Sequence, residues 1–154
     1  MKIIISTDGS DFSRTAVEKA CQIIADPKNT EVKVVAVYQA VLPLDAFQQS
    51  VEYAEKEERS EQAKAEEFAQ ARARVIEEKF PNSGLSITSQ AIMGAPDQIL
   101  IDSANKWKAD IIVVGSHGRG FLERTFQGSI SDSLVHHAPC SVFVVRPTKH
   151  ENTN

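Results

Sequence analysis

The stretch from Asp110 to Gly128 constrains the fold of this chain more than any other. Ile111 to Val114 are four apolar residues in a row and include two β-branched valines, so they predict a strand buried on both faces. Glycines stand where this strand should end, at Gly115 and Gly118, and a further glycine follows at Gly128. A buried strand that runs into glycines is typical of the parallel sheet of an α/β protein.

A helix is predicted directly after these glycines. Ile130, Leu134 and Val135 fall on one face at helical spacing, and Ser129 lies near the predicted start. The first turn of a helix carries unpaired backbone N–H groups and the positive end of the helix dipole, and both attract anions.

The strand, the glycine turn and the helix start together predict a seat for a polyphosphate. Glycine has no Cβ, so backbone N–H groups beside it can approach a phosphate closely. The residues expected around this seat are Gly115, Gly118, Gly128 and Ser129, whose hydroxyl adds a donor. An alternative stays open, in which these glycines serve only the geometry of a turn between strand and helix.

Two common phosphate-binding motifs are excluded by the residues present. The chain contains no Gly-Lys-Ser or Gly-Lys-Thr sequence, so it has no Walker A loop. Gly118-Arg119-Gly120 is followed by Glu123 where a dinucleotide-binding motif requires a third glycine.

Strands and helices are predicted to alternate along the whole chain. The predicted strands are Ile3 to Ser6, Glu31 to Tyr38, Leu85 to Ala91, Ile111 to Val114 and Val142 to Val145. The predicted helices are Asp11 to Ala25, Gln49 to Lys79, one that opens at Pro96 and one that follows Gly128. This alternation favours a parallel sheet with helices on both faces. Trp107 is interpreted as a core residue of the third helix.

The charged segment from Gln49 to Lys79 is interpreted as a helix with a solvated face. It is rich in Glu, Lys, Arg, Gln and Ala, which are strong helix formers, and Phe68, Val75 and Ile76 form a narrow apolar stripe along it. The alternative is an arm that binds an unidentified protein partner. The sequence does not decide the role of residues 40–66.

Two polar residues stand where a ligand would be expected. Asp8 follows the first predicted strand, and open α/β sheets bind ligands just outside the carboxyl ends of their strands. The alternative is a carboxylate that caps the following turn. His117 lies between two glycines, where it either donates to a phosphate or faces solvent in the loop.

Composition limits the partners and the compartment. The chain has 154 residues, enough for one domain, and a formal net charge of −4 with no basic tract, so nucleic acid is not an expected partner. It has no apolar run of about 20 residues, so we expect no membrane span. Met1-Lys2 leads directly into a strand without a signal peptide, and Cys21 and Cys140 are not paired in a motif. We therefore expect a cytoplasmic protein whose two cysteines pack as small apolar residues.

Five landmarks in this order resemble the universal stress protein family, and specifically its ATP-binding members. The first is the glycine signature already described, in which nine residues separate Gly118 from Gly128-Ser129. The other four landmarks are Ile3 to Ser10 with its Asp-Gly-Ser turn, Met93 to Pro96, Ala109 to Gly115, and Ala138 to Arg146. The resemblance covers nearly the whole chain. Thr125 and Gln127 depart from it, since relatives often carry aliphatic residues there.

The resemblance implies a fold and a domain organisation. The fold would be a single-domain, open, five-stranded parallel sheet of order 3-2-1-4-5 with helices on both faces, Rossmann-like and similar to adenine nucleotide alpha hydrolases. The domain would span residues 1–148, and residues 149–154 would be a flexible tail. Strands one and four would then be neighbours, and a crevice would open between their carboxyl ends.

The resemblance also implies a binding site for ATP in this crevice. Adenine would lie near the backbone of Val37, the ribose near Asp8 and Gly115, and the phosphates on the amides of the glycine loop. The nucleotide-contacting residues carried over are Thr7, Asp8, Val37, Met93, Gly115, His117, Gly118, Arg119, Gly128, Ser129 and Ile130. Magnesium would be held mainly by the phosphates, and no protein ligand for a metal is assigned.

The function expected from this resemblance is a nucleotide-dependent switch in a stress response, with ATP hydrolysis at most slow. The sequence identifies no general base and no Walker B carboxylate for rapid hydrolysis. A homodimer is expected through the last strand, Val142 to Val145, unless the chain's own tail covers that edge. Two alternatives stay open: a dimeric interaction module that does not use nucleotide, and a nucleotidyl or phosphoryl transferase.

Overall fold

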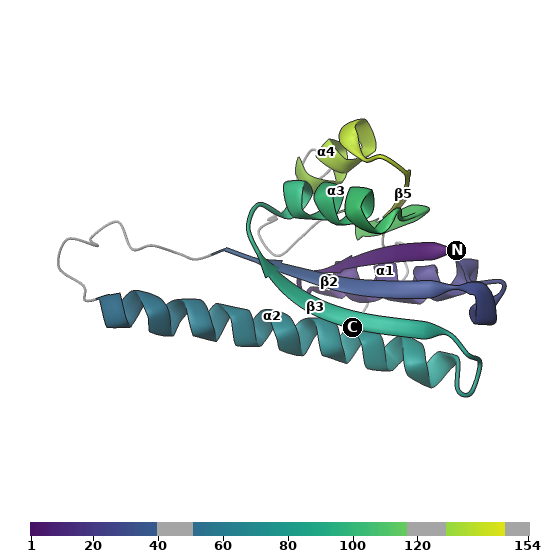
Figure 1. The fold of residues 1–154 in the computed structure, drawn as a ribbon, viewed down its shortest axis with the longest axis horizontal. Helices are drawn as coiled ribbons and strands as arrows, with labels where there is room; N and C mark the ends of the chain where they lie inside the picture. Colours follow the sequence, from purple (N-terminus) through teal and green to yellow (C-terminus); the bar gives the residue numbers. More distant parts are fainter. Residues whose placement is uncertain (40–50, 117–128, 147–154) are drawn as a thin grey trace, which may run out of the picture.

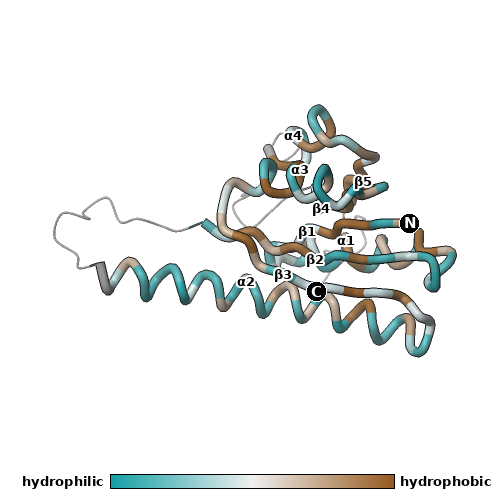
Figure 2. The backbone as a smooth tube through the Cα atoms, viewed as in Figure 1, coloured by the Kyte–Doolittle hydropathy of each residue, from teal (hydrophilic) through white to brown (hydrophobic). Residues whose placement is uncertain are grey.

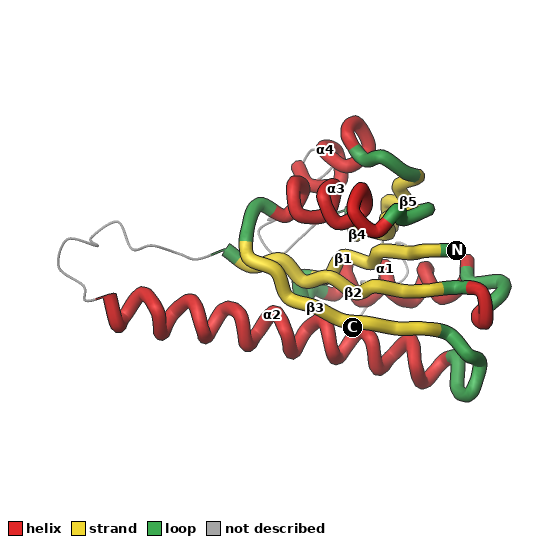
Figure 3. Tube along the Cα trace, viewed as in Figure 1, coloured by secondary structure: helices red, strands yellow, loops and turns green. Residues whose placement is uncertain are grey.

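A computed structural model of the chain describes residues 1–39, 51–116 and 129–146. Its strands form one parallel sheet in the order β3-β2-β1-β4-β5, as expected from the resemblance (Figure 1, Figure 3). In chain order the elements are β1 (Lys2–Thr7), α1 (Asp11–Ile23), the 3-10 turn η1 (Pro27–Asn29), β2 (Glu31–Tyr38), α2 (Val51–Lys79), β3 (Ser86–Met93), α3 (Pro96–Trp107), β4 (Ile111–Gly115), α4 (Ser129–His137) and β5 (Ser141–Val145).

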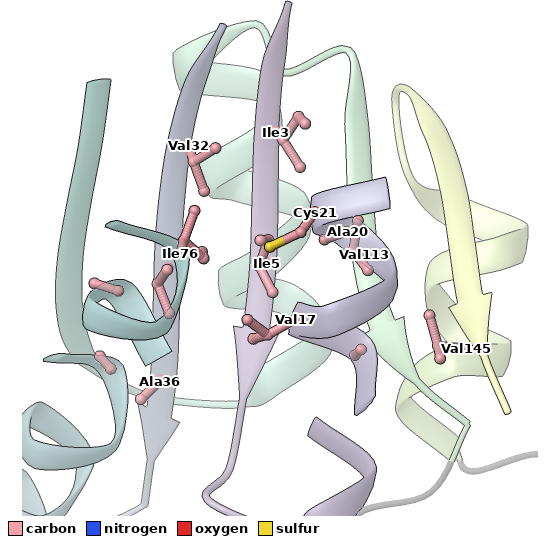
Figure 4. Close-up of a cluster of buried hydrophobic side chains, with 14 of the residues drawn as sticks. Ile3, Ile5, Val17, Ala20, Cys21, Val32, Ala36, Ile76, Val113 and Val145 are labelled. Carbon is pink, nitrogen blue, oxygen red and sulfur yellow. The ribbon is translucent and has the colours of Figure 1, made fainter. Parts of the chain in front are cut away.

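Helices cover both faces of the sheet, and each face has its own hydrophobic core. Ile3 and Ile5 of β1 point to the side of α1 and α2, where Figure 4 shows them with Val17 and Cys21 of α1. Ile4 points to the other side, where α3 and α4 supply Leu100, Ala104 and Leu134. The isoleucines of β1 are completely buried, and each contributes about 1.5–3 kcal/mol of hydrophobic free energy. The apolar run of the first strand thus reflects burial on both faces.

The register of the strands brings distant parts of the chain to one edge of the sheet. Ile5 of β1 pairs with Val113 of β4, and Thr7 pairs with Ala36 of β2. All five strands are parallel, so the residues that follow β1, β2, β3 and β4 leave the sheet at the same edge. We call this the carboxyl edge.

The helix α2 packs on the sheet along only part of its length. Its buried residues are three alanines and one isoleucine, namely Ala65, Ala69, Ala73 and Ile76. Of the side chains described from Tyr53 to Lys64, none is buried, and Figure 1 shows this end of α2 extending past the sheet. The hydropathy colouring of Figure 2 is mostly hydrophilic along the helix. The predicted solvated face is therefore present.

In the helix α4, the predicted apolar face differs from the observed one at one residue. Leu134 is completely buried and Ile130 is partly buried, but Val135 is 50% exposed. At about 100° per residue, position 135 lies roughly 140° around the helix from position 130, too far to share its face. The helix predicted from Asp11 to Ala25 ends at Ile23, because Ile24 already has an extended backbone conformation.

Trp107 lies at the margin of the core between the sheet and the helices α3 and α4. The Trp107 ring is only partly buried against the α3–α4 core, and the Nζ atoms of Lys33 and Lys2 lie 4.2 Å and 5.5 Å from its centroid. Its outer part is thus covered by cations, which the sequence did not indicate.

Cys21 lies within one core and Cys140 beside the other, and burial raises the pKa of both thiols. No helix in the described part of the chain combines the length and apolarity needed to span a bilayer.

Candidate functional site

The carboxyl edge of the sheet gathers the predicted site residues that the structure describes. β1 ends at Thr7, β2 at Tyr38, β3 at Met93 and β4 at Gly115, and α1, α3 and α4 begin beyond these strands. A hydrogen bond from Ser133 Oγ to Asp97 Oδ2, 2.8 Å long, joins α4 near its start to the first turn of α3. The N-termini of α1, α3 and α4, which carry the positive ends of the helix dipoles, face the same edge.

Asp8 forms a tight turn between β1 and α1. Its Oδ1 atom accepts hydrogen bonds from the backbone N–H of Ser10, at 3.0 Å, and from the Ser10 hydroxyl, at 2.6 Å. Ser10 is in turn the N-cap of α1, because its Oγ accepts from Ser13 N at 3.2 Å. The carboxylate thus has the capping role that was the alternative interpretation, and it lies at the carboxyl edge of the sheet.

Thr7 lies beneath this turn. Its side chain is only 2% exposed, and its hydroxyl donates to Ser13 Oγ at 3.1 Å and accepts from Gly9 N at 3.3 Å. The sequence predicted Thr7 as a contact to a nucleotide. In the structure its hydroxyl group supports the backbone of the turn from within the protein.

Val37 and Met93 lie at neighbouring strand ends. Val37 pairs with Ile92, and Tyr38 pairs with Met93, while Gly94 N donates to Tyr38 O at 2.9 Å. Val37 is partly buried against the α3–α4 core, and Met93 is 48% exposed. An exposed thioether beside a strand end offers an apolar, adaptable surface.

The end of β4 lies beside the end of β1, as expected. Gly115 is partly buried, and the next residue, Ser116, is buried and donates from its backbone N–H to Val145 O at 2.8 Å. Ser129 begins α4, and Ile130 follows in its first turn. Four of the predicted contacts, His117, Gly118, Arg119 and Gly128, lie outside the described residues.

Sequence reasoning missed several residues at this edge. Buried polar side chains gather near the site, and three that the sequence analysis did not assign are Ser13, Ser116 and Ser131. A serine directly after a buried strand, or in the first turn of a helix, was the only available signal for them. The contact between Phe68 of α2 and Gly9 was also missed, since the spacing of Phe68 indicated only the apolar stripe of a helix.

Among the described residues, the carboxyl edge carries hydroxyl groups, backbone amides and the carboxylates of Asp8 and Asp97. Among residues 1–39, 51–116 and 129–146, no group of three His, Cys, Asp or Glu side chains is arranged to hold a metal ion. His136 and His137 lie in the last turn of α4, far along the helix from its start at the carboxyl edge. Groups of this kind suit a polar, anionic ligand that accepts from N–H donors and donates to a carboxylate.

Comparisons with known proteins agree on one family. The model of the universal stress protein family matches residues 1–146. A universal stress protein of Methanocaldococcus jannaschii is 33% identical over 97% of this chain and 84% of its own length. The structure of universal stress protein UspA from Lactobacillus plantarum has a TM-score of 0.78 at 24% identity, covering 95% of this chain and 97% of that one. A universal stress protein solved in complex with cAMP has a TM-score of 0.58 at 25% identity, covering 95% of this chain and 96% of that one.

Proposed function

The chain belongs to the universal stress protein family, and from that premise we propose that it binds ATP at the carboxyl edge of its sheet. One observation carries the proposal: the ends of β1 and β4 lie side by side at the point where the strand order reverses. Parallel α/β sheets bind ligands in the crevice that opens there. The relative solved with cAMP supports an adenine nucleotide as the ligand class.

The proposed pose divides the nucleotide among the strand ends. Adenine contacts the backbone of Val37 and the side chain of Met93, and the ribose hydroxyls donate to Asp8 beside Gly115. The phosphates accept hydrogen bonds from backbone amides of the glycine loop and of the first turn of α4. The predicted phosphate contacts are His117, Gly118, Arg119, Gly128, Ser129 and Ile130. Thr7 supports the turn that carries Asp8. Magnesium binds mainly through the phosphates.

A nucleotide-dependent switch in a stress response is the activity that this site supports best. Hydrolysis needs a base or a residue that orients water, and acceleration usually also needs an arginine at the transferred phosphate. The sequence supplies a binding loop without a recognisable base, so hydrolysis is at most slow. We propose that an unidentified protein partner recognises the nucleotide-bound form.

Substitution of Asp8 tests the ribose contact. We expect Asp8→Ala to weaken ATP binding about tenfold, as is typical when a hydrogen bond to a charged group is lost. Asp8→Asn keeps an acceptor for Ser10 but removes the charge, so it should weaken binding with little loss of stability. Isothermal titration calorimetry with ATP, ADP, AMP and cAMP measures the affinity and shows which phosphates contribute.

The control for this experiment is Ser10→Ala. It removes the hydroxyl that donates to Asp8 Oδ1 and caps α1, but it leaves the carboxylate in place. Equal affinities for the wild type, Asp8→Asn and Asp8→Ala would mean that Asp8 only caps the turn. No binding of any of the four nucleotides by the wild type would favour the nucleotide-independent interaction module.

We further propose a homodimer through the outer edge of β5. Among the described strands β5 pairs only with β4, and Val142, Phe143 and Val144 are only partly buried. Lysine on an edge strand discourages strand pairing, so we expect Phe143→Lys to shift the protein to monomer in sedimentation equilibrium.

The matched control is Ile87→Lys on β3, the opposite edge of the sheet. Ile87 and Phe143 are both partly buried and pack against the same core, so the two substitutions should cost similar stability. Only Phe143→Lys should change the molecular mass. A wild-type protein that remains monomeric at high concentration, or a monomer produced equally by both variants, contradicts the proposed interface.

A further inference from the structure

The ring of Phe68 lies directly against the Asp8 turn. A Cβ atom placed on Gly9 would be 2.7 Å from Cδ1 of Phe68 and 2.8 Å from both Cγ and Cε1. These are three adjacent carbons of one ring at nearly equal distances, so Gly9 lies over the face of the ring rather than at its rim. Contacts under 3.0 Å essentially never occur for a real Cβ, so the ring position requires glycine here.

Gly9 also has a backbone conformation that favours glycine. Its φ is +80°, in the region that residues with a side chain rarely adopt. The turn between Asp8 and Ser10 is therefore held in one shape by two separate constraints: the conformation of Gly9 and the surface of the ring below it.

The position of Phe68 is set by the packing of α2. Ala65 and Ala69 flank Phe68 and are buried against the sheet, with exposures of 5% and 0%. Small side chains at this contact let the helix lie close to the strands, and interhelix and helix–sheet distances depend on such side chains. The backbone at Phe68 is thereby fixed, and the ring is directed at the carboxyl edge.

The hydrogen bonds of the turn, in contrast, connect near neighbours. They join Asp8 to Ser10, Thr7 to Gly9, and Thr7 and Ser10 to Ser13. Bonds of this kind define the local form of the turn, but they move with it as a unit. Phe68 instead connects the turn to a helix that is separately anchored on the sheet.

We propose that Phe68 is a positioning residue, which holds the Asp8 turn in the form that binds nucleotide and so makes affinity depend on the seating of α2. This inference rests on the proposed function and deepens it, because it assigns a role at the site to a helix outside the predicted nucleotide contacts. A misplacement of a binding group by about 1 Å is enough to lower affinity or rate strongly.

The test compares Phe68→Ala with a matched truncation on the same helix. Val75 is partly buried, packs against the same core and lies about two turns farther along α2, away from the carboxyl edge. Phe68→Ala should weaken ATP binding about tenfold in calorimetry. Val75→Ala should lower the unfolding temperature while leaving the affinity for ATP within about twofold of the wild type. Phe68→Tyr keeps the ring face and should restore most of the affinity.

A double-mutant cycle of Phe68→Ala and Gly9→Ala measures the coupling between the ring and the turn, and this second test does not depend on the stability of one variant. In the wild-type background Gly9→Ala introduces both backbone strain and a clash with the ring. In the Phe68→Ala background the clash is relieved, so the added loss of affinity and of stability from Gly9→Ala should be clearly smaller. Additive effects would mean that the ring and the turn are not coupled.

The outcomes separate this inference from the proposed function. If the wild type binds ATP but Phe68→Ala binds it equally well, the positioning role is wrong and the nucleotide site stands. If Phe68→Ala and Val75→Ala weaken binding equally, the effect is one of general stability and the inference is again overturned. If the wild type binds no adenine nucleotide, the proposed function fails and this inference fails with it.

Discussion

Gly128→Val is expected to weaken ATP binding by about 100-fold or more, since it removes or displaces at least two hydrogen bonds to charged phosphate oxygens. A branched side chain at this position would stand between the loop amides and the phosphates. The prediction follows from the glycine signature in the sequence, because Gly128 lies outside the described residues. Calorimetry with ATP measures the loss, and thermal unfolding checks that the fold is unchanged.

Gly84→Val is the control for a valine at a glycine turn. Gly84 precedes β3 at the amino edge of the sheet and has a φ of +80°, so the substitution strains the backbone far from the proposed site. It should lower stability and leave the affinity for ATP unchanged. Unaltered binding by Gly128→Val would remove the phosphate seat from the proposal.

Ile5→Ala is expected to cause a large loss of stability. Ile5 is completely buried on the central strand, with Val34 and Val113 as its neighbours in the sheet. Loss of the side chain and the resulting cavity should cost about 2–5 kcal/mol. For a domain of this size the unfolding temperature should fall by roughly 10 °C, measured by circular dichroism or calorimetry.

Ile23→Ala is the matched control for this truncation. Ile23 is the same residue type and packs against the same core from the end of α1, but it is only partly buried. Its truncation should cost about half as much free energy of unfolding as that of Ile5, because neighbouring groups and water can fill the space left at a partly exposed site. An equal or greater loss for Ile23 would contradict the assignment of the core to the centre of β1.

Most of the individual elements were predictable from the residues alone. The apolar runs of β1, β2 and β4, the cap at Ser10 and the helical composition of α2 depend on side chains that act over a few positions. Val135 shows the limit of that reasoning, because an apolar residue next to a buried one was assigned to the wrong face of α4. Trp107 shows another limit, since its lysine neighbours come from β1 and β2.

The candidate site was predictable only in part. Asp8 was predicted by the rule that ligands bind beyond strand ends, and Gly115 by the glycine turn after a buried strand. The structure places these two strand ends side by side. The strand order itself came from the resemblance to a family and not from the pattern of residues. Thr7 was predicted as a nucleotide contact, and the hydrogen bonds of its hydroxyl to Ser13 and Gly9 were not predictable from the sequence.

The sequence by itself determined where strands and helices form and where glycine and carboxylate groups interrupt them, because periodicity, capping and turn sterics are local. Only the tertiary structure decided which of these groups meet. Lys2 N donates to Asp110 Oδ2 although the two residues are 108 positions apart, and Phe68 of α2 reaches Gly9 in the turn after β1. Such contacts result from strand pairing and from the packing of helices on the sheet, and both depend on the whole chain at once.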